Sequence, residues 1–410
     1  MNALELLRAR GLVEQVTAED ELAKALDAGP MTIYAGFDPT ADSLHCGHLL
    51  PLMGLARLQR LGHRVIALVG GGTGRIGDPS GRTELRKVLS HEQIDANVAA
   101  IRGQIERFII IDGEQGLLVN NADWLLKWSY VDWLREVGRH FTVNRMLAVK
   151  TYRDRFEGEN GLNFIEFNYQ LLQSYDFLHL FREHDCRIQI GGNDQWGNIV
   201  AGVDLIRRVT EDQGSFGLTI PLITTASGAK MGKTADGAVW LDASKTSPND
   251  LYQYWRSCQD ADVAKFLKVF TFLELDEIDS LTAESGEAMN EAKRRLAFEM
   301  TKTLHGEAAA EAARAAEFGS VSAVPAVTLE AADAAQLDGE GLGLLDAFVR
   351  VAGLLGSNGE VRRGIKNGGV KVNGEPVKDP HRRLTRDDFD ADGNCLLSFG
   401  KKKKKRLCLG

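Results

Sequence analysis

Near the start of the chain a strand, a helix and a second strand follow one another within about 40 residues, and this pattern restricts the fold more than any other feature. The first strand is the short apolar run 32–37. Apolar residues at helical spacing occupy 49–61, Gly62 ends that helix, and the apolar run 64–69 forms the second strand. Such a unit needs parallel strands and a right-handed crossover. The sequence therefore predicts an α/β protein with a Rossmann-like parallel-sheet core.

The rest of the chain is predicted to add helices around this sheet and two further domains. Residues 1–30 have helical periodicity, and 187–190 returns to the sheet as a strand. Helical patterns dominate 91–181, which we interpret as an insertion that covers one edge of the sheet. The predicted division is a sheet-containing domain at 1–246 with its helical insertion at about 91–181, a small helical domain at 247–318, an Ala-, Gly- and Val-rich linker at 319–342, and a C-terminal α+β domain at 343–410.

Composition and cysteine placement exclude several classes of protein. Apolar residues make up 44% of the 410 residues and charged residues 26%, which is ordinary for a globular protein with a buried core. No N-terminal segment resembles a secretion signal, and no uncharged apolar run reaches the roughly 18 residues that span a bilayer. The five cysteines are scattered without a C-x-x-C pair, which argues against a disulfide framework and a structural zinc. We therefore expect a cytoplasmic protein with no membrane partner and no structural metal.

Charge is distributed unevenly along the chain. The net charge is −8, yet residues 345–410 contain 15 Lys and Arg against 8 Asp and Glu. A basic C-terminal module on an acidic body indicates a polyanionic partner. The lysine-rich run 401–406 is equally compatible with a solvated end.

Two glycine-rich motifs suggest nucleotide-binding folds that their neighbouring residues do not support. Residues 72–77 match the dinucleotide fingerprint, but 78–81 is turn chemistry with a carboxylate where a pyrophosphate would lie. Residues 228–234 nearly form a Walker A loop, but the spacing is one residue short and Ser227 stands where the first glycine is required. A dehydrogenase and a P-loop NTPase are therefore both disfavoured.

The segment 34–48 has chemistry suited to a nucleotide. It runs from a strand end to a helix N-terminus, where free N–H groups and a partial positive charge suit phosphates. His45 and His48 are three residues apart, so they are expected to share a helix face, and Gly47 leaves room for a flat base. The same residues would also fit a surface helix or half of a metal site.

The segment 230–234 is a glycine-containing loop with lysines at both Lys230 and Lys233. Mobile ammonium groups are suitable point charges for a leaving pyrophosphate. An isolated pair of this kind is more often part of a solvated basic loop. The two segments gain specificity only when they are considered together.

Together they resemble the HIGH and KMSKS signatures of class I aminoacyl-tRNA synthetases, in the expected order on a Rossmann-like core. Along nearly the whole chain the resemblance is to the bacterial tyrosyl-tRNA synthetase family, through the stretches YAGFDPTADSLHCGHLLPL, GDPSGRTELR, FNYQLLQSYDF, IGGNDQWGN and GAKMGKT. The C-terminal stretch that begins LLDAFVRVAG resembles an S4 RNA-binding module. The resemblance implies a ligase that activates L-tyrosine with ATP, releases pyrophosphate and transfers tyrosine to the 3′ end of tRNA(Tyr).

The resemblance also implies a role for each site residue. Tyrosine binding falls on Tyr34 and Asp176 for the phenolic hydroxyl, on Asp78, Tyr169 and Gln173 for the α-amino group, and on Gln195 near the carboxylate. ATP binding falls on Gly36, Asp38, Gly47, Gly192, Asp194 and Lys233. The catalytic residues that stabilise charge on the triphosphate are Thr40, His45, His48, Arg82, Arg86, Lys230 and Lys233. RNA binding falls on Arg350, Arg362, Arg363, Lys366 and Lys371, beside a tight turn at Asn373-Gly374.

Further implications are Mg²⁺ bound with the pyrophosphate, no organic cofactor, and a homodimer with contacts through the helical insertion. The chain departs from the family signatures at Cys46, Gly232 and Thr234, and Arg82 replaces a common lysine. Cys46 is expected to pack inward. Two rival functions stay open: a tryptophanyl-tRNA synthetase, which normally lacks an S4 module, and an RNA-binding regulatory protein on an inactive synthetase core.

Overall fold

The predicted strand–helix–strand unit lies at the centre of a six-stranded sheet in the computed structural model, which describes residues 2–80, 89–158, 161–226, 228, 231–234, 237–317, 324–390, 393–400 and 403–409. β2 (Thr32–Phe37), α3 (Leu49–Arg60) and β3 (Arg64–Val69) coincide with the predicted segments. The strand order is β1-β6-β5-β2-β3-β4. Five of these strands run parallel, and β1 pairs antiparallel with β6. The predicted α/β fold is confirmed.

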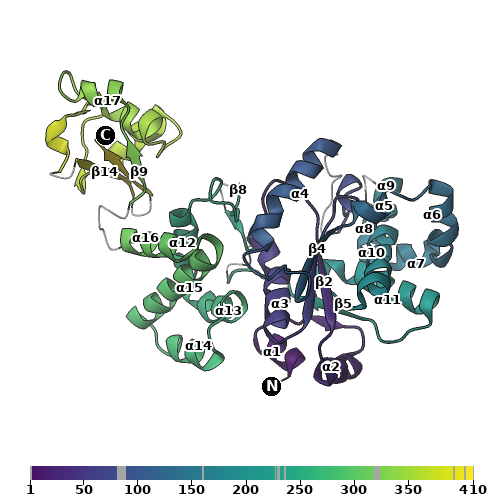
Figure 1. Ribbon diagram of the computed structural model, residues 1–410. Coiled ribbons are helices and arrows are strands. Elements are labelled where there is room, and N and C mark those ends of the chain that lie inside the picture. The colour runs from purple at the N-terminus through teal and green to yellow at the C-terminus, as the bar shows by residue number, and fades with distance from the viewer. Residues whose placement is uncertain are drawn as a thin grey trace. The chain divides into compact units, whose positions relative to one another are not determined.

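Helices cover both faces of this sheet (Figure 1). α3 packs against β2, β3 and β5 on one face, while α10 (Tyr169–His184) and α11 (Trp196–Thr210) lie against the other. The buried core between the sheet and α10 and α11 consists of Tyr34, Ile66, Leu68, Phe177, Leu178, Leu180, Cys186, Leu205 and Ile206. Burial of both faces explains why β2, β3, β5 (Cys186–Gly192) and β6 (Phe216–Ile220) are almost continuously apolar rather than alternating.

The segment predicted as a helical insertion contains one strand of the sheet. β4 (Gly116–Asn120) pairs parallel with β3 and forms the edge of the sheet. Helical periodicity in the flanking residues concealed this five-residue strand. The helices of the segment are α4 (His91–Ile105), α5 (Ala122–Leu125), α6 (Tyr130–Glu136), α7 (Val143–Ala148), α8 (Lys150–Glu157) and α9 (Phe164–Phe167), with a short turn of 3₁₀ helix at Gly138–His140.

The N-terminal region forms two helices rather than the one that its periodicity predicts. α1 (Ala3–Ala9) ends before Gly11, which has φ +75°, and α2 (Glu19–Ala28) begins after the short strand β1 (Gln15–Val16). A positive φ favours glycine and cannot continue a right-handed helix. The interruption lets β1 add a strand beside β6.

The chain divides into two compact units, one of residues 1–246 and 258–296 and the other of residues 247–257 and 297–410. The helical stretch between the sheet and the C-terminal region contributes to both, so the domain boundaries predicted from the sequence stay a prediction. Its helices are α12 (Pro248–Arg256), α13 (Asp260–Phe270), α14 (Leu275–Leu281), α15 (Glu287–His305) and α16 (Glu307–Glu317). Among the described helices, none is both long and apolar enough to cross a bilayer.

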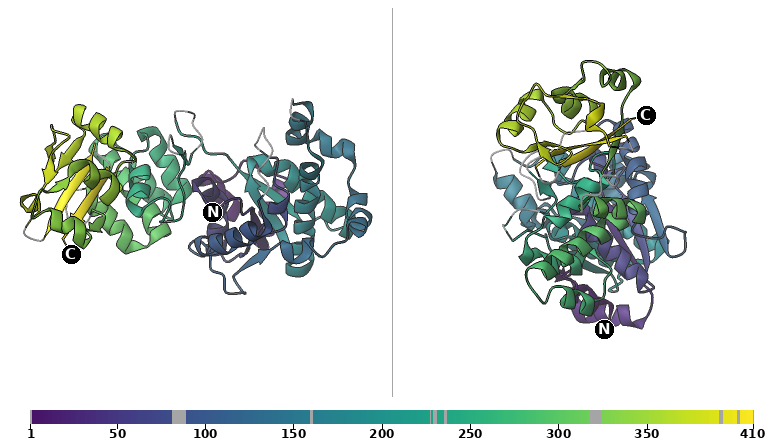
Figure 2. Two further views of the ribbon diagram at one scale, coloured as in Figure 1. Left: turned by 90° about the horizontal axis from the view of Figure 1, so that it is seen from above. Right: turned by 90° about the vertical axis from the view of Figure 1, so that its left-hand side faces the viewer.

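The C-terminal part of the second unit is a five-stranded sheet of order β12-β11-β14-β15-β9, drawn in green and yellow in Figure 2. Part of the predicted linker belongs to this sheet. β9 (Ala326–Thr328) pairs parallel with β15 (Lys403–Cys408), and Leu329 and Leu337 are buried in its core. Only a short apolar run marks β9, so the small-residue composition of the region concealed it.

The remaining C-terminal elements surround that core. They are α17 (Ala331–Gln336), β10 (Leu342–Gly343), α18 (Leu344–Asp346), a π-helical turn at Ala347–Val351, α19 (Asn358–Lys366), β11 (Val370–Val372), β12 (Glu375–Pro376), β13 (Arg383–Leu384), a 3₁₀ turn at Arg386–Asp388 and β14 (Asn394–Phe399). Asn373 and Gly374 form the two-residue turn between β11 and β12, with φ of 49° and 86°. The predicted tight turn is confirmed, since such hairpins need positive φ at both positions.

Two glycines of α19 provide a matched test of packing in this unit. A Cβ at Gly364 would lie 2.4 Å from Phe399 Cε2, so Gly364→Ala is expected to lower the local free energy of unfolding by about 1–3 kcal/mol through overpacking. At Gly359 the nearest atom would be Ser357 Oγ at 3.9 Å, so Gly359→Ala should raise it by up to about 1 kcal/mol. Hydrogen exchange of β14 amides measures both changes. Equal exchange in the two variants would contradict this packing.

Candidate functional site

A cleft opens at the carboxyl ends of β2 and β5. The chain passes from β2 outward to β3 and β4, and then returns to place β5 on the other side of β2. Ligands of open α/β sheets bind at such a reversal of strand order. The cleft has about 1250 Å³ of empty volume, part of it open to solvent. It is lined by all the predicted site residues of this unit whose side chains are described: Tyr34, Gly36, Asp38, Thr40, His45, Gly47, His48, Asp78, Tyr169, Gln173, Asp176, Gly192, Asp194 and Gln195.

One end of the cleft contains a buried hydroxyl and a buried carboxylate. Tyr34 of β2 is 1% exposed, and its Oη has no hydrogen-bond partner among the described residues. Asp176 of α10 is also buried and accepts hydrogen bonds from Asn121 Nδ2 and Trp124 Nε1, each at 2.8 Å. Burial raises the pKa of Asp176 to about 8, against the lowering effect of these two donors. Burial, followed by the charge of Asp176, also raises the pKa of Tyr34.

A single amide connects this carboxylate to a second one. Asn121 Nδ2 donates to Thr73 Oγ1 at 3.0 Å as well as to Asp176, and Thr73 Oγ1 donates to Asp38 Oδ1 at 2.8 Å. The other oxygen of Asp38 accepts from Tyr169 Oη at 2.9 Å. The orientation of the Asn121 amide is fixed, because its oxygen accepts from Gly72 N at 2.7 Å. The two carboxylates therefore belong to one buried network.

A second polar group lies around Asp78. Its Oδ1 accepts from the Ser80 backbone N at 2.8 Å, and its Oδ2 accepts from Gln195 Nε2 at 2.6 Å. Asn198 Nδ2 donates to the side-chain oxygens of both Gln173 and Gln195 at 3.2 Å. The group presents carboxylate and amide oxygens to the cleft, which are acceptors suited to an ammonium group.

Another part of the cleft is formed by the start of the helical segment that follows β2. His45 caps a 3₁₀ turn (Cys46–His48), and α3 begins directly after it, so the predicted helix N-terminus at this place is confirmed. His45 Nδ1 accepts from the Gly47 backbone N at 3.0 Å, and His48 Nδ1 accepts from the His45 backbone N at 3.1 Å. The centroids of the two imidazole rings lie 4.1 Å apart. A Cβ at Gly47 would lie 2.8 Å from His45 Cε1, so the glycine is needed here.

The described part of the lysine segment lies directly beside these histidines. Cys46 N donates to Val239 O at 3.0 Å, and Val239 N donates to Gly232 O at 2.9 Å. A Cβ at Gly232 would be 3.0 Å from Cys46 Cβ, and Gly232 has φ +81°. Glycine is therefore favoured at this departure from the family signature. Cys46 is fully buried, which confirms that it packs inward.

Four of the predicted site residues have no side-chain description. Arg82, Arg86 and Lys230 lie outside the described residues, and Lys233 is described only as backbone, in β7 (Lys233–Thr234). β7 pairs with β8 (Gly237–Ala238). The structure thus brings two distant segments of backbone together, while the positions of these four side chains stay outside the description.

Four further residues that line the cleft or hold its side chains were missed from the sequence. Asn121 and Trp124 follow β4, the strand that helical periodicity concealed, so no strand end marked them as candidates. Thr73 lies in a 3₁₀ turn (Thr73–Arg75) inside the decoy dinucleotide motif. Gln189 did carry a signal, as a polar residue between two isoleucines in the buried middle of β5. It lines the cleft, and its Oε1 has no hydrogen-bond partner among the described residues.

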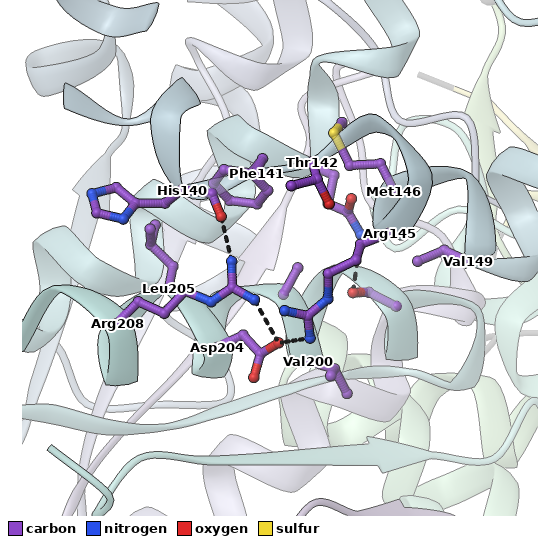
Figure 3. Close-up of a pocket in the computed structure, with 13 residues that line it drawn as sticks. His140, Phe141, Thr142, Arg145, Met146, Val149, Val200, Asp204, Leu205 and Arg208 are labelled. Atoms are coloured by element: carbon purple, nitrogen blue, oxygen red, sulfur yellow. Dashed lines mark hydrogen bonds and ion pairs between the residues drawn. The ribbon is translucent and has the colours of Figure 1, made fainter. Parts of the chain in front are cut away.

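A second cavity between the 140–149 region and α11 contains none of the predicted site residues (Figure 3). Two of its cations share one carboxylate. Arg145 Nη2 donates to Asp204 Oδ2 at 2.8 Å, and Arg208 Nη2 lies 3.8 Å from the same oxygen. Arg208 also donates to His140 O. These contacts partly neutralise the cavity, which lacks the convergent acceptors and donors of the main cleft.

The predicted RNA-binding residues lie in the other unit. Arg362, Arg363 and Lys366 are exposed on α19, and Lys371 is half-buried on β11. Arg350 is instead held in a bidentate ion pair with Asp333, at 2.6 and 3.0 Å. The exposed face of α19 is therefore a better candidate surface for a polyanion than Arg350.

Comparison with known proteins agrees with this geometry. Residues 26–318 match the family model of class I tRNA synthetases for tryptophan and tyrosine, and residues 344–390 match the S4 domain. A tyrosine–tRNA ligase of Desulfosudis oleivorans is 49% identical, covering 98% of both chains, and one of Clostridium tetani is 48% identical, covering 100% of this chain and 99% of its own. The crystal structure of a C-terminally truncated mitochondrial tyrosyl-tRNA synthetase of Aspergillus nidulans covers 77% of this chain and 93% of its own, at 32% identity with a TM-score of 0.69.

The raised pKa of Asp176 predicts a specific pH dependence of stability. An aspartate in the unfolded chain has a pKa of about 3.9, so between roughly pH 4 and 8 the folded protein holds a proton that the unfolded chain has lost. The contribution of Asp176 to the free energy of unfolding therefore falls as pH rises through this window, by about 1.4 kcal/mol per pH unit in its middle. Denaturant unfolding of the wild type and of Asp176→Asn at several pH values measures the difference. Parallel pH profiles would contradict the prediction.

Proposed function

The chain belongs to the bacterial tyrosyl-tRNA synthetase family of class I, and we propose that it acts as a tyrosine–tRNA ligase through the cleft at the carboxyl ends of β2 and β5. The observation that carries the proposal is that fourteen residues, predicted from scattered stretches of sequence, all line this one cleft. A surface evolved for RNA binding alone would not need buried acceptors beside a helix N-terminus.

Recognition of tyrosine is proposed at the buried end. The phenolic hydroxyl would donate to Asp176 and accept from Tyr34 Oη, the buried group that has no described partner. Phenylalanine would leave both groups unpaired, which agrees with the discrimination known for tyrosyl-tRNA synthetases generally. The α-amino group would meet Asp78, Tyr169 and Gln173. The hydroxyl of Tyr169 donates to Asp38, so the phenol oxygen faces this ammonium as an acceptor.

Nucleotide binding is proposed at the histidine end. Gly36, Gly47 and Gly192 would let the adenosine approach the backbone, with Asp38 and Asp194 near the ribose hydroxyls. A Cβ at Gly192 would lie 2.6 Å from Asp194 Oδ1, so a side chain there would displace that carboxylate. Thr40, His45 and His48 would face the triphosphate, with Lys230, Lys233, Arg82 and Arg86 as further sources of positive charge.

The chemistry needs no nucleophilic side chain. A carboxylate oxygen of tyrosine attacks the α-phosphorus of ATP, and the bond to the bridging oxygen breaks, so that pyrophosphate leaves with the electron pair. The protein holds the two reactants in line and neutralises charge that grows on the pyrophosphate. A ribose hydroxyl at the 3′ end of tRNA(Tyr) then attacks the tyrosyl carbonyl, and AMP leaves.

Mg²⁺ is proposed to enter with ATP. Among the described residues no group of three or more His, Cys, Asp and Glu side chains is arranged to hold a metal ion. Mg²⁺ commonly keeps water molecules and substrate phosphates as its ligands, so it does not require such a group. It would supply further neutralisation of the phosphates, beside the cationic side chains of the protein.

The proposed enzyme is a homodimer in the cytoplasm. The support for a homodimer is that large apolar side chains are exposed on the helices of the inserted segment, where a second copy of the chain would cover them: Leu126, Tyr130, Val131, Leu134, Val143, Phe156, Phe164 and Ile165. The location follows from the proposed reaction, because tRNA is charged where translation uses it.

The direct test of the function is amino-acid-dependent exchange between ATP and pyrophosphate. Tyrosine is expected to support exchange, and tryptophan and phenylalanine are not. Exchange with tryptophan would indicate the tryptophanyl rival, against which the buried Tyr34 and Asp176 and the S4 module argue. Absence of exchange with every amino acid would indicate an inactive synthetase core.

Substitution of His45 and of Lys233 by alanine separates catalysis from binding. His45→Ala and Lys233→Ala are each expected to slow formation of tyrosyl-adenylate by roughly 100-fold, because they remove charge stabilisation at the pyrophosphate. Tyrosine affinity should stay nearly unchanged, since neither residue is placed beside tyrosine. Single-turnover kinetics and equilibrium binding measure the two effects, with the exposed His381→Ala as control. A loss of tyrosine affinity as large as the loss of rate would refute these roles.

Substitution of the exposed cations of α19 tests the proposed binding of tRNA, the second substrate. The double variant Arg362→Gln/Arg363→Gln is expected to weaken tRNA charging. It should also reduce the steepness of the plot of log affinity for tRNA against log salt concentration by about 2, because two phosphate contacts are lost. Tyrosine-dependent exchange should not change. Arg350→Gln should have a smaller effect on charging, since Arg350 is paired with Asp333. A larger effect at Arg350 than at α19 would indicate that the RNA-binding surface lies around Arg350 rather than on α19.

A further inference from the structure

The N-terminal end of α13 contacts residues 223–226, which form the stem that leads into the lysine segment (230–234). Asp262, in the first turn of α13, is 1% exposed, and its Oδ2 accepts from the Ala226 backbone N at 2.9 Å. Its Oδ1 lies 3.1 Å from Lys265 Nζ. Lys265 Nζ also donates to Thr224 O at 2.7 Å. One buried carboxylate and one lysine thus hold the backbone on both sides of Thr225, five residues before Lys230.

Burying the carboxylate of Asp262 costs free energy unless its oxygens find partners that replace water. A buried carboxylate is retained only with hydrogen bonds or a counter-ion, and Asp262 has both from the stem and from Lys265. The stem is also closed from the other side, where Met231 N donates to Ile223 O at 3.1 Å. The described backbone on either side of the segment's start, at Thr224, Ala226 and Met231, is therefore held by hydrogen bonds.

The C-terminal end of α13 is fixed to the helix that begins at the histidines. Arg57 of α3 is buried and donates through Nη2 to the carbonyl oxygens of Lys268, Val269 and Thr271, at 3.0, 3.2 and 2.5 Å. A guanidinium at this position satisfies carbonyls that the helix end leaves free. Burial lowers the pKa of Arg57 to about 9, which still leaves it protonated at neutral pH. α13 packs beside α3 (Figure 1).

We propose that Asp262 and Lys265 are positioning residues for the lysine segment, and that α13 sets the distance between this segment and the histidines at the start of α3. The inference rests on the proposed function, because it assigns the two residues to the step that forms pyrophosphate. Neither residue lines the cleft in which tyrosine is proposed to bind. Their effect on the reaction is confined to the step in which the lysines meet the triphosphate.

The test compares the two steps of the reaction in the full-length protein. Asp262→Ala is expected to slow adenylate formation by on the order of ten-fold, as a misplaced charge would, and to slow the reverse reaction with pyrophosphate equally. Tyrosine affinity and transfer of tyrosine to tRNA from preformed adenylate should not change, because pyrophosphate has left before transfer. Asp262→Asn keeps an oxygen for Ala226 N and should recover part of the rate. Lys265→Met should give an intermediate loss.

Lys268→Met is the matched control. It lies on the same helix and pairs with Asp279 at 2.9 Å rather than with the stem. It should leave every rate unchanged. If Asp262→Ala does not fold, the Asn and Met variants still decide the question through the same comparison. Equal slowing of adenylate formation and transfer, or no slowing in any variant of Asp262 or Lys265, would overturn the proposal. The wild-type exchange with tyrosine, measured alongside, tests the proposed function separately.

Discussion

The cleft depends on burying two carboxyl groups in one hydrogen-bonded network. Asp38 and Asp176 come from different elements, and each would be costly to bury alone. One amide, Asn121, donates to Asp176 and to Thr73, and the hydroxyl of Thr73 donates to Asp38. Because both hydrogens of the amide are used, this chain of hydrogen bonds, anchored directly after β4, sets how the two carboxyl groups lie relative to one another. The network therefore gives the site its shape before any ligand binds.

The second constraint is the convergence of segments that are far apart in the sequence. The parallel sheet places the ends of β2 and β5 side by side, so that 36–48 and 192–195 face one cleft. The chain after the lysine segment then runs back along the histidine turn, through Cys46 N to Val239 O and Leu241 N to Leu44 O. This pairing brings the backbone of the lysine segment beside a helix N-terminus. It also explains why glycine, with its positive φ, occupies 232.

Sequence periodicity predicted the central elements well because β2, α3 and β3 have strong local patterns and ordinary lengths. It failed where a short strand is embedded among helices or small residues. β4 and β9 have five and three residues, and tertiary pairing rather than local propensity makes them strands. The site residues were predicted mainly from the resemblance to the family motifs, and fourteen of them line one cleft. Asn121, Trp124 and Thr73 could not be found that way, since their role is to hold other side chains and depends on a strand that was missed.

The central claim is that one cleft holds tyrosine and a nucleotide in line, with the phenol buried and the phosphates beside the histidines. A crystal structure with a non-hydrolysable sulfamoyl analogue of tyrosyl-adenylate tests it most directly. The account predicts the phenolic oxygen within hydrogen-bonding distance of Tyr34 Oη and the Asp176 carboxylate, with the adenosine against Gly47 and Gly192. An analogue bound in the cavity beside Arg145, or with its phenol directed to solvent, would contradict it.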